Sequence, residues 1–319
     1  MPAEPRTVRA ALPPTEARHP LSTALDDLDT LPLLELINDQ DATVPGAVRA
    51  ALPQLAALVE AGLAALRGGG RVHYYGAGAG GRIALGDALE LGPTYGVGPE
   101  AVLAHLAGGP AAATGAVEAA EDGAPDPVDP DRPVAGDLVI GVTASGRTPY
   151  VARALADARA AGAVTALLSG DPAAAAAVHA DLHVVLATGP EVVTGSTRMK
   201  AGTAQKLALN AFSTALMVRS GRTWSNLMVA ASARNGKLRA RAVRTLVTAC
   251  GVTTERATAC LDACGDETAT ALVVLTTGAA PARARAALAA HGGRPFAAVR
   301  ALAGAADADG AAAAEGARE

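Results

Sequence analysis

The sequence predicts an α/β protein: a doubly wound, five-stranded parallel sheet with helices before it and a small helical subdomain after it. Short runs rich in Val, Leu and Ile alternate with helical segments, and they lack the polar alternation of half-buried strands. Two runs end in a glycine-containing turn followed at once by a helix start, as at the ligand-binding edge of open α/β sheets. The strands are predicted at 71–75, 101–106, 138–142, 164–169 and 182–187.

The segments before the first strand are expected to be helical. Residues 1–14 should form a flexible, proline-rich arm. A short helix is predicted near 30–39, with Thr30 as its N-cap, and a longer one at 44–67, where Leu and Val recur at helical spacing. Because no strand precedes these helices, they must cap the sheet or form an oligomer interface.

A glycine-rich turn, GAGAGGR at 76–82, follows the first predicted strand and opens a helix. One interpretation of this turn is a dinucleotide-binding site, since its sequence satisfies the G-x-G-x-x-G motif. About 20 residues onward, however, the sequence reads GPTYGVGPE where a ribose-binding acid should stand. We therefore favour a loop that binds a phosphate or a sugar.

The central stretch, DLVIGVTASGRTPY at 137–150, has the same layout. Its apolar run fits a strand buried on both faces, and the turn lies at the carboxyl end of that strand. Ser145 and Thr148 add hydroxyl donors, and Gly146 permits close backbone approach. For an isolated S-G-x-T, an ordinary strand-to-helix turn with a serine cap is the alternative. The repetition of the layout in two loops favours the phosphate loop.

The connections and the C-terminal part are predicted to be mostly helical. An Ala-rich helix should run through Glu118 and Glu121, another should span 172–180, and a long one should follow Gly195. The predicted organisation is a flexible arm at 1–14, an α/β domain with its N-terminal helices at 15–235, a helical subdomain at 236–303 and a disordered tail at 304–319.

Composition points to a small-molecule partner. Half of the 319 residues are hydrophobic but only 2% are aromatic, so the core must be built from Ala, Val and Leu. The net charge of -4 is mild and the basic residues are scattered, which argues against nucleic-acid and membrane partners. Cys250, Cys260 and Cys264 include no C-x-x-C pair and have no His at ligand spacing, so we expect buried thiols and no metal. The N-terminus has no apolar signal core, and a cytoplasmic location is expected.

Six segments together resemble one known family, the bacterial N-acetylmuramic acid 6-phosphate etherases, which have a sugar-isomerase (SIS) domain with a flavodoxin-like sheet. The vertebrate glucokinase regulatory protein is similar in the same segments. TGSTRMKAGTAQK at 194–206 is the most specific of them, and the resemblance extends from about residue 15 to 302. The others are 76–82, TYGV at 94–97, AVEAAED at 116–122, 144–150 and NLMV at 226–229.

The resemblance implies a cofactor-free carbon–oxygen lyase of cell-wall sugar recycling. Such an enzyme removes D-lactate from the 3-position of N-acetylmuramate 6-phosphate and leaves N-acetylglucosamine 6-phosphate. It also implies a homodimer whose site is completed by the partner. The substrate-binding residues carried over from the family motifs are Gly78, Gly80, Gly81, Arg82, Ser145, Gly146, Arg147, Thr148, Ser196, Thr197 and Lys200.

The same resemblance assigns the catalytic roles to Glu90 and Glu121. In the open-chain sugar, the aldehyde acidifies the hydrogen on C2, so that a base can remove it while an acid protonates the departing lactyl oxygen. Two carboxyl groups in opposite protonation states suit this chemistry. Glu121 would be the base, and Glu90 would protonate lactate and then activate water. We expect Leu89 and Leu91 to bury Glu90 and thereby raise its pKa.

The sequence also departs from the family pattern. Ala79 and Gly80 stand where Thr-Ser is usual, so the first loop has lost a hydroxyl donor. Leu89 replaces a small residue, Leu91-Gly92 replaces Cys-Pro, and Ala230 replaces Asp. Two alternatives to the etherase therefore stay open: a regulatory protein that binds a phosphosugar without turnover, and an aldose-ketose isomerase. The presence of both glutamates counts against the isomerase, which needs no second acid at C3.

Overall fold

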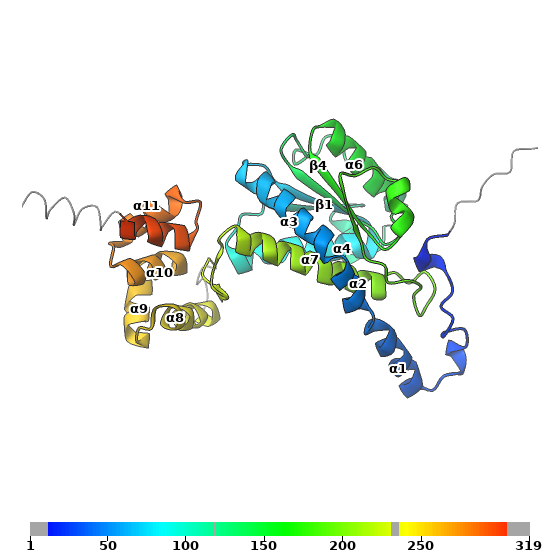
Figure 1. Ribbon diagram of the computed structural model, residues 1–319, viewed down its shortest axis with the longest axis horizontal. Helices are drawn as coiled ribbons and strands as arrows, with labels where there is room; N and C mark the ends of the chain where they lie inside the picture. Colours follow the sequence, from blue (N-terminus) through cyan, green and yellow to red (C-terminus); the bar gives the residue numbers. More distant parts are fainter. Residues whose placement is uncertain (1–11, 118, 231–235, 305–319) are drawn as a thin grey trace, which may run out of the picture. The chain divides into compact units, whose positions relative to one another are not determined.

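The computed structural model describes residues 12–117, 119–230 and 236–304, and it confirms the predicted parallel sheet (Figure 1). The strands are paired in parallel in the order β2-β1-β3-β4-β5. Most of the predicted arm at 1–14 and nearly all of the predicted tail at 304–319 lie outside the described residues. The strands are β1 (Val72–Gly76), β2 (Val102–Leu106), β3 (Leu138–Val142), β4 (Val164–Ser169) and β5 (Leu182–Val185).

The chain forms two compact units. The first comprises Met1–Asp87 and Glu100–Phe212 and contains the whole five-stranded sheet; the second comprises Ala88–Pro99 and Ser213–Glu319. Two long helices, α4 (Gly78–Tyr95) and α7 (Lys200–Arg219), begin in the first unit and end in the second. The predicted domain boundaries at 14, 235 and 303 stay predictions.

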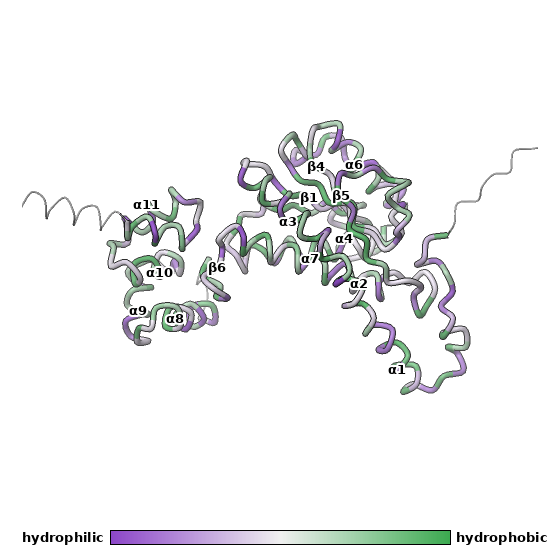
Figure 2. The backbone as a smooth tube through the Cα atoms, in the orientation of Figure 1, coloured by the Kyte–Doolittle hydropathy of each residue, from purple (hydrophilic) through white to green (hydrophobic). Residues whose placement is uncertain are grey.

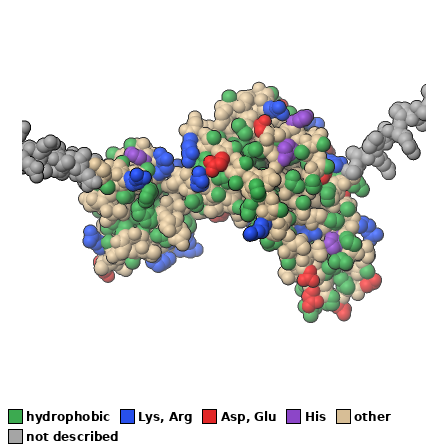
Figure 3. Space-filling model, viewed as in Figure 1, with side chains coloured by type: hydrophobic (Ala, Val, Ile, Leu, Met, Phe, Trp, Pro, Cys, Tyr) green, Lys and Arg blue, Asp and Glu red, His purple; other side chains and the backbone are tan. Residues whose placement is uncertain are grey.

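The core of the first unit lies on both faces of the sheet. Helix α6 (Pro149–Ala160) covers one face, and α3 (Leu52–Arg67) contacts the sheet from the other (Figure 1). All five residues of β1 and of β3 are buried, as expected for central strands. The apolar run of β4 is visible as a green stretch of the tube in Figure 2. On the face shown in Figure 3, Lys and Arg lie scattered, in agreement with their spread along the sequence.

The predicted single helix at 44–67 is wrong, because the structure contains two helices there, α2 (Val44–Ala50) and α3. Pro53 is the second residue of α3, where it lacks the N–H that a continuous helix needs. Helix α1 (Thr30–Asp41) precedes them, with Asp29 and not Thr30 at the N-cap position. No single described helix is long and apolar enough to cross a membrane. The segments Thr30–Ala50 and Leu52–Arg67 together would be long and apolar enough, but the chain bends by 58° between them.

The connection between β2 and β3 also differs from the prediction. Instead of an Ala-rich helix through Glu121, the structure has a single helical turn, α5 (Ala111–Thr114), and a separate 3-10 turn, η3 (Ala120–Asp122). Glu118 lies outside the described residues. The Arg82 side chain binds the carbonyl oxygens of Ala112 and Gly115, which a continuing helix would need as acceptors. Likewise, the helix predicted at 172–180 is the 3-10 turn η4 (Pro172–Ala176).

The second unit has a helical C-terminal region, as predicted. Buried Leu246, Leu261 and Leu272 pack together in one core, and Cys264 is buried with them, whereas Cys250 and Cys260 are half-buried. A short hairpin of β6 (Thr223–Trp224) and β7 (Leu227–Met228) was not predicted. The helices are α8 (Gly236–Cys250), α9 (Thr254–Ala263), α10 (Thr268–Thr277), α11 (Pro281–Ala290) and a last one at 295–304; the short turns η1 (Pro14–Glu16) and η2 (Leu25–Asp27) belong to the first unit.

Candidate functional site

The two glycine-containing loops lie next to each other at one edge of the sheet. Strands β1 and β3 are neighbours and pair in register up to their last residues, Gly76 and Val142. Helix α4 then begins at Gly78, and α6 begins at Pro149. Two helix N-termini therefore follow adjacent parallel strands at the same level, and their free amides and positive dipole ends suit an anion.

The first loop is shaped by glycines that leave no room for side chains. A β-carbon on Gly81 would lie 2.4 Å from Cδ1 of Leu106. Gly78 has a φ of 53°, in the left-handed region that favours glycine. Gly80 is buried, and a β-carbon there would lie 3.2 Å from Oε1 of Gln205 on α7. The first loop thus offers its backbone to a ligand.

Arg82 is engaged by the chain itself. Its Nε donates to the carbonyl of Ala112 (2.8 Å) and its Nη2 to that of Gly115 (2.6 Å). From the other side, Arg153 of α6 donates to the carbonyls of Asp122 and Gly123. Two arginines therefore hold the backbone on either side of Glu121.

The second loop is ordered by its own hydroxyl groups. The Oγ1 atoms of Thr143 and Thr148 lie 2.8 Å apart, and Oγ of Ser145 accepts a 3.1 Å hydrogen bond from the amide of Arg147. Gly146 has a φ of 70°, and a β-carbon there would lie 2.2 Å from that of Ala174. Because Ser145 is an acceptor in this turn, its own proton can be donated to a ligand.

Arg147 is held by a buried acid. Its Nη2 lies 3.3 Å from Oδ2 of Asp171, which is 3% exposed and also accepts the amide of Ala173 at the start of η4. The sequence prediction missed Asp171. Its only signal was its position directly before Pro172, which is typical of a helix cap.

The third segment, 194–206, leads into α7. The carboxylate of Glu191, which is fully buried, accepts hydrogen bonds of 2.9 Å from the amides of Lys200 and Ala201. A carboxylate of the chain thus occupies the N-terminus of α7, so this helix start is not a third anion site. The Lys200 side chain is 3% exposed and donates to Oε1 of Gln40 on α1 (3.1 Å). Burial lowers the pKa of Lys200, while the charge of Glu191 acts in the opposite direction.

The remaining predicted residues of this segment, Ser196 and Thr197, are half-buried in the turn before α7. That turn also approaches the first loop, because a β-carbon on Gly202 would lie 3.3 Å from the carbonyl of Thr197 and 3.4 Å from Cδ1 of Ile83 on α4. Within the first unit the structure therefore brings together all three predicted loops. Their assignment to substrate binding stays a prediction.

The two candidate catalytic glutamates belong to different units. Glu121 is exposed on η3 in the first unit, and Glu90 is exposed on the part of α4 that belongs to the second unit. The expectation that Leu89 and Leu91 bury Glu90 is wrong for the described chain, because only Leu91 is buried and Leu89 is 66% exposed. On a helix, neighbouring positions face different directions, so the apolar side chains beside Glu90 cannot both cover it.

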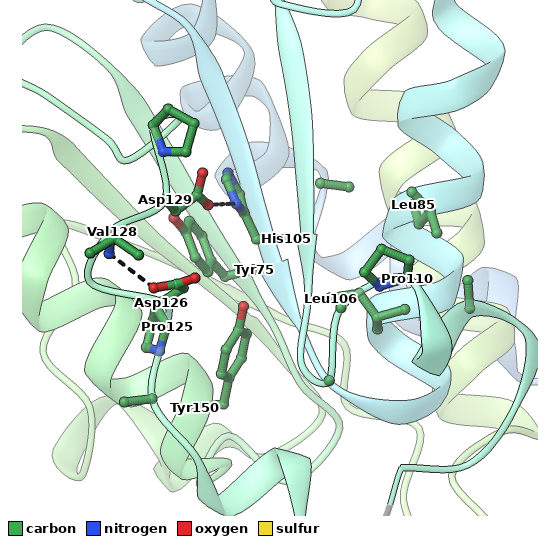
Figure 4. Close-up of a pocket in the computed structure, with 16 residues that line it drawn as sticks. Tyr75, Leu85, His105, Leu106, Pro110, Pro125, Asp126, Val128, Asp129 and Tyr150 are labelled. Atoms are coloured by element: carbon green, nitrogen blue, oxygen red, sulfur yellow. Dashed lines mark hydrogen bonds and ion pairs between the residues drawn. The ribbon is translucent and has the colours of Figure 1, made fainter.

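The first unit also contains a cavity of about 740 Å³ that was not predicted (Figure 4). His105 and Tyr75 form part of its wall, with their rings stacked at 4.2 Å, and Tyr150 and Asp129 line it from α6 and the β2–β3 connection. Burial, with a smaller contribution from Asp129, raises the pKa of Tyr150 to about 12.

Behind this wall runs a chain of polar side chains, of which His73 and Asp137 are buried and His105 and Asp129 are half-buried. Nδ1 of His73 lies 3.0 Å from Nε2 of His105, and their other ring nitrogens lie 3.1 Å from carboxylate oxygens of Asp137 and Asp129, respectively. Burial is the main cause that lowers the pKa of His73 to about 4 and also lowers that of His105. In the described part of the chain, no group of three or more His, Cys, Asp or Glu side chains could hold a metal ion.

Comparison with known proteins finds several similar relatives. The N-acetylmuramic acid 6-phosphate etherase of Thermobifida fusca (strain YX) is 53% identical over 265 residues, which cover 83% of this chain and 87% of the relative. That of Mycolicibacterium smegmatis is 47% identical over 267 residues (83% and 90%). N-acetylmuramic acid 6-phosphate etherase 2 of Vibrio parahaemolyticus is 44% identical over 282 residues (88% and 94%).

No family model matches the chain. Among solved structures, E. coli CFT073 c3406 in complex with A5P is 19% identical, with a TM-score of 0.46, and the match covers 62% of this chain and 97% of that one.

Proposed function

Because the chain belongs to the N-acetylmuramic acid 6-phosphate etherase family, we propose that it acts as a carbon–oxygen lyase on the D-lactyl ether of N-acetylmuramate 6-phosphate. The products are N-acetylglucosamine 6-phosphate and D-lactate. The observation that carries the proposal is the in-register ending of β1 and β3 at Gly76 and Val142, each followed by a helix start. This arrangement would present two sets of backbone amides to one phosphate.

The phosphate would bind between the first and second loops. The amide of Gly80, which is free in the first turn of α4, would face an anion with the positive end of the helix dipole, whereas that of Gly81 donates to the carbonyl of Ala77. Ser145 adds a hydroxyl donor from the second loop, and Thr148 precedes α6 at its N-cap. The sugar would then extend from this anchor toward Glu121, which belongs to the same unit.

The proposed reaction takes place at C2 and C3 of the open-chain sugar. Glu121 first removes the C2 proton, which the neighbouring aldehyde acidifies, and an enolate forms. The electron pair of the enolate then expels the lactyl oxygen as the C3–O bond breaks. Glu90 gives its proton to that oxygen. The resulting carboxylate of Glu90 takes a proton from water as the water adds to C3, and Glu121 returns its proton to C2. The net change is the addition of one water across the ether, with D-lactate as the leaving group.

Two contacts support the role of Glu121 as a positioned base. Arg82 and Arg153 each bind two carbonyl groups of the β2–β3 connection, one on each side of Glu121. Because Arg82 also belongs to the first turns of α4, it couples the phosphate loop to the segment that carries the base. Anchoring the backbone on both sides holds a general base on a short turn in a fixed position relative to its substrate.

The proposal includes a homodimer. Helix α1 buries none of its residues, and it exposes 65% of Leu31 and 56% of Leu34. Gln40 of α1 contacts Lys200, so the helix lies beside the segment that leads into α7. Its exposed leucines form a suitable surface for a second copy of the chain. Sedimentation should show a dimer, and Leu34→Asp should shift it toward monomer with loss of activity. A fully active wild-type monomer would rule the dimer out.

We also propose a cytoplasmic location, since a sugar phosphate does not cross a bilayer unaided.

Incubation with N-acetylmuramate 6-phosphate tests the reaction, with D-lactate as the measured product and unphosphorylated N-acetylmuramate as the control. We expect D-lactate only from the phosphorylated sugar. Gly80 lacks the hydroxyl donor that is usual at this position, and this absence favours one alternative function, that of a regulatory protein that binds the phosphosugar without turnover. Tight binding without lactate release would favour this alternative, and interconversion of aldose and ketose phosphates would favour an isomerase.

A further inference from the structure

Gln205 on α7 lies against the first turn of α4. Its amide oxygen and nitrogen would lie 3.2 and 3.5 Å, respectively, from a β-carbon on Gly80. Although Gln205 is only 3% exposed, its amide makes no hydrogen bond with any described residue. The fully enclosed side-chain N and O atoms without a partner in the described chain are those of Thr15 and Thr188, so the amide atoms of Gln205 are reachable from outside the protein. They therefore keep their hydrogen-bonding capacity for a ligand.

The surroundings of Gln205 identify that ligand as an anion. The β-carbon position of Gly80 lies 3.3 Å from the carbonyl of Val142, the last residue of β3, so Gln205 reaches the point where the first and second loops meet. Residues 78–81 carry no side-chain donor, and the free backbone amides at this helix N-terminus are those of residues 78–80, because Gly81 donates to the carbonyl of Ala77. An amide side chain adds one directed donor to this cluster of backbone donors.

Gly80 and Gln205 are also matched in size. A side chain at position 80 would meet Oε1 of Gln205 at 3.2 Å, which is closer than an ordinary van der Waals contact. Hence the glycine leaves the space that the glutamine amide fills. A serine at position 80 would crowd Gln205, whose amide would have to shift by a few tenths of an ångström.

We propose that Gln205 is a specificity-determining substrate contact, whose amide nitrogen donates a hydrogen bond to a phosphate oxygen of the phosphosugar. The inference rests on the proposed binding of that phosphate between the two loops. Gln205 thereby supplies from α7 the side-chain donor that the first loop lacks. Since Glu191 occupies the N-terminus of α7, this helix contributes to the phosphate through a side chain and not through its amides.

Calorimetric binding of N-acetylglucosamine 6-phosphate tests the proposal, since no turnover complicates it. Gln205→Met should weaken binding about threefold to tenfold, the effect of one lost hydrogen bond. Gln205→Glu, which keeps the shape but places a negative charge beside the phosphate, should weaken it by more than about tenfold. Asn210→Ala is the matched control: it removes an exposed amide from the same helix and should bind as the wild type does.

A second pair of variants tests the shared space. Gly80→Ser alone should not improve binding, because its side chain crowds Gln205. In the Gln205→Ala background the same serine should recover most of the lost affinity. Wild-type affinity in both Gln205→Met and Gln205→Glu would overturn the proposal, as would equal losses in Gln205→Glu and Asn210→Ala. Thermal unfolding of each variant identifies any loss that comes from misfolding, and Gln205→Glu, which is isosteric, is the variant to use if Gln205→Met unfolds.

The two proposals can fail separately. If the wild type releases no D-lactate from N-acetylmuramate 6-phosphate but phosphosugar binding still depends on Gln205, the inference stands and the reaction is wrong. If D-lactate is released normally by Gln205→Glu at unchanged KM and binding, the reaction stands and the inference is wrong.

Discussion

The carbonyl oxygen of Gly76 lies 2.6 Å from the position that a β-carbon on Gly81 would take. In the other direction, a β-carbon on Gly76 would lie 2.7 Å from Cα of Gly81. The end of β1 and the start of α4 therefore touch backbone to backbone. This close approach fixes where the amides of the first loop point, and it explains the glycines at both positions.

Gly81→Ala should destabilise the protein, because its methyl group would overlap the Gly76 carbonyl and the Leu106 side chain. We expect a loss of about 1–3 kcal/mol in the free energy of unfolding, as in other overpacked cores. Gly86→Ala on the same helix is the control: a β-carbon there meets nothing within 4 Å. That change should stabilise by about 0.5–1 kcal/mol through helix propensity. Urea unfolding measures both, and a stabilised Gly81→Ala would contradict the packing described.

Ser145→Ala should weaken substrate binding more than turnover. The phosphate is remote from C2 and C3, so its contacts change little between ground state and transition state. We expect KM to rise about threefold to tenfold with kcat within about twofold of the wild type. Thr148→Ala should behave similarly. Steady-state kinetics with N-acetylmuramate 6-phosphate measures the split, and a large drop in kcat at unchanged KM would mean that the second loop has another role.

Acidification should destabilise the protein through His73. Burial lowers the pKa of His73 from 6.5 to about 4, and that of His105 moves in the same direction. Below pH 6.5 the unfolded chain therefore binds protons that the folded chain does not, and folding stability falls as the pH decreases toward 4. The loss from His73 alone is roughly 3 kcal/mol.

Urea unfolding at several pH values between 7.5 and 4 measures this slope. His73→Asn should flatten it, and His179→Asn, at an exposed position, is the matched control. The charged and titratable groups that act on His73 are His105, Asp137 and Arg71, and neither variant replaces any of them. An unchanged slope in His73→Asn would show that other groups cause the acid sensitivity.

Strands and loops were predictable where their determinants are local. The apolar run of β3 and the turn that follows it are contiguous in sequence, so the strand at 138–142 was predicted at its observed position, and the helix start expected within 137–150 is that of α6 at Pro149. The helix at 44–67 was mispredicted although its signal was also local. Pro53 was visible in the sequence, but the apolar periodicity across it was given more weight.

Long-range contacts explain what the sequence could not predict. The Ala-rich segment after β2 has strong helix propensity, yet Arg82, some 30 residues earlier, takes two of its carbonyls. Glu191 and Gln205 likewise gain their roles only through folding: one caps α7, and the other reaches Gly80. No spacing rule links such pairs, so their partners became apparent only in three dimensions.

Deuterium incorporation at C2 in D₂O tests the central claim most directly, because stepwise elimination separates the roles of the two glutamates. Glu90→Gln cannot protonate lactate but keeps the base, so it should release no D-lactate and still exchange the C2 hydrogen of N-acetylmuramate 6-phosphate. Glu121→Gln should lose both exchange and release, and the wild type should show both. Exchange by Glu121→Gln but not by Glu90→Gln would reverse the assignment, and normal D-lactate release by both variants would contradict the mechanism.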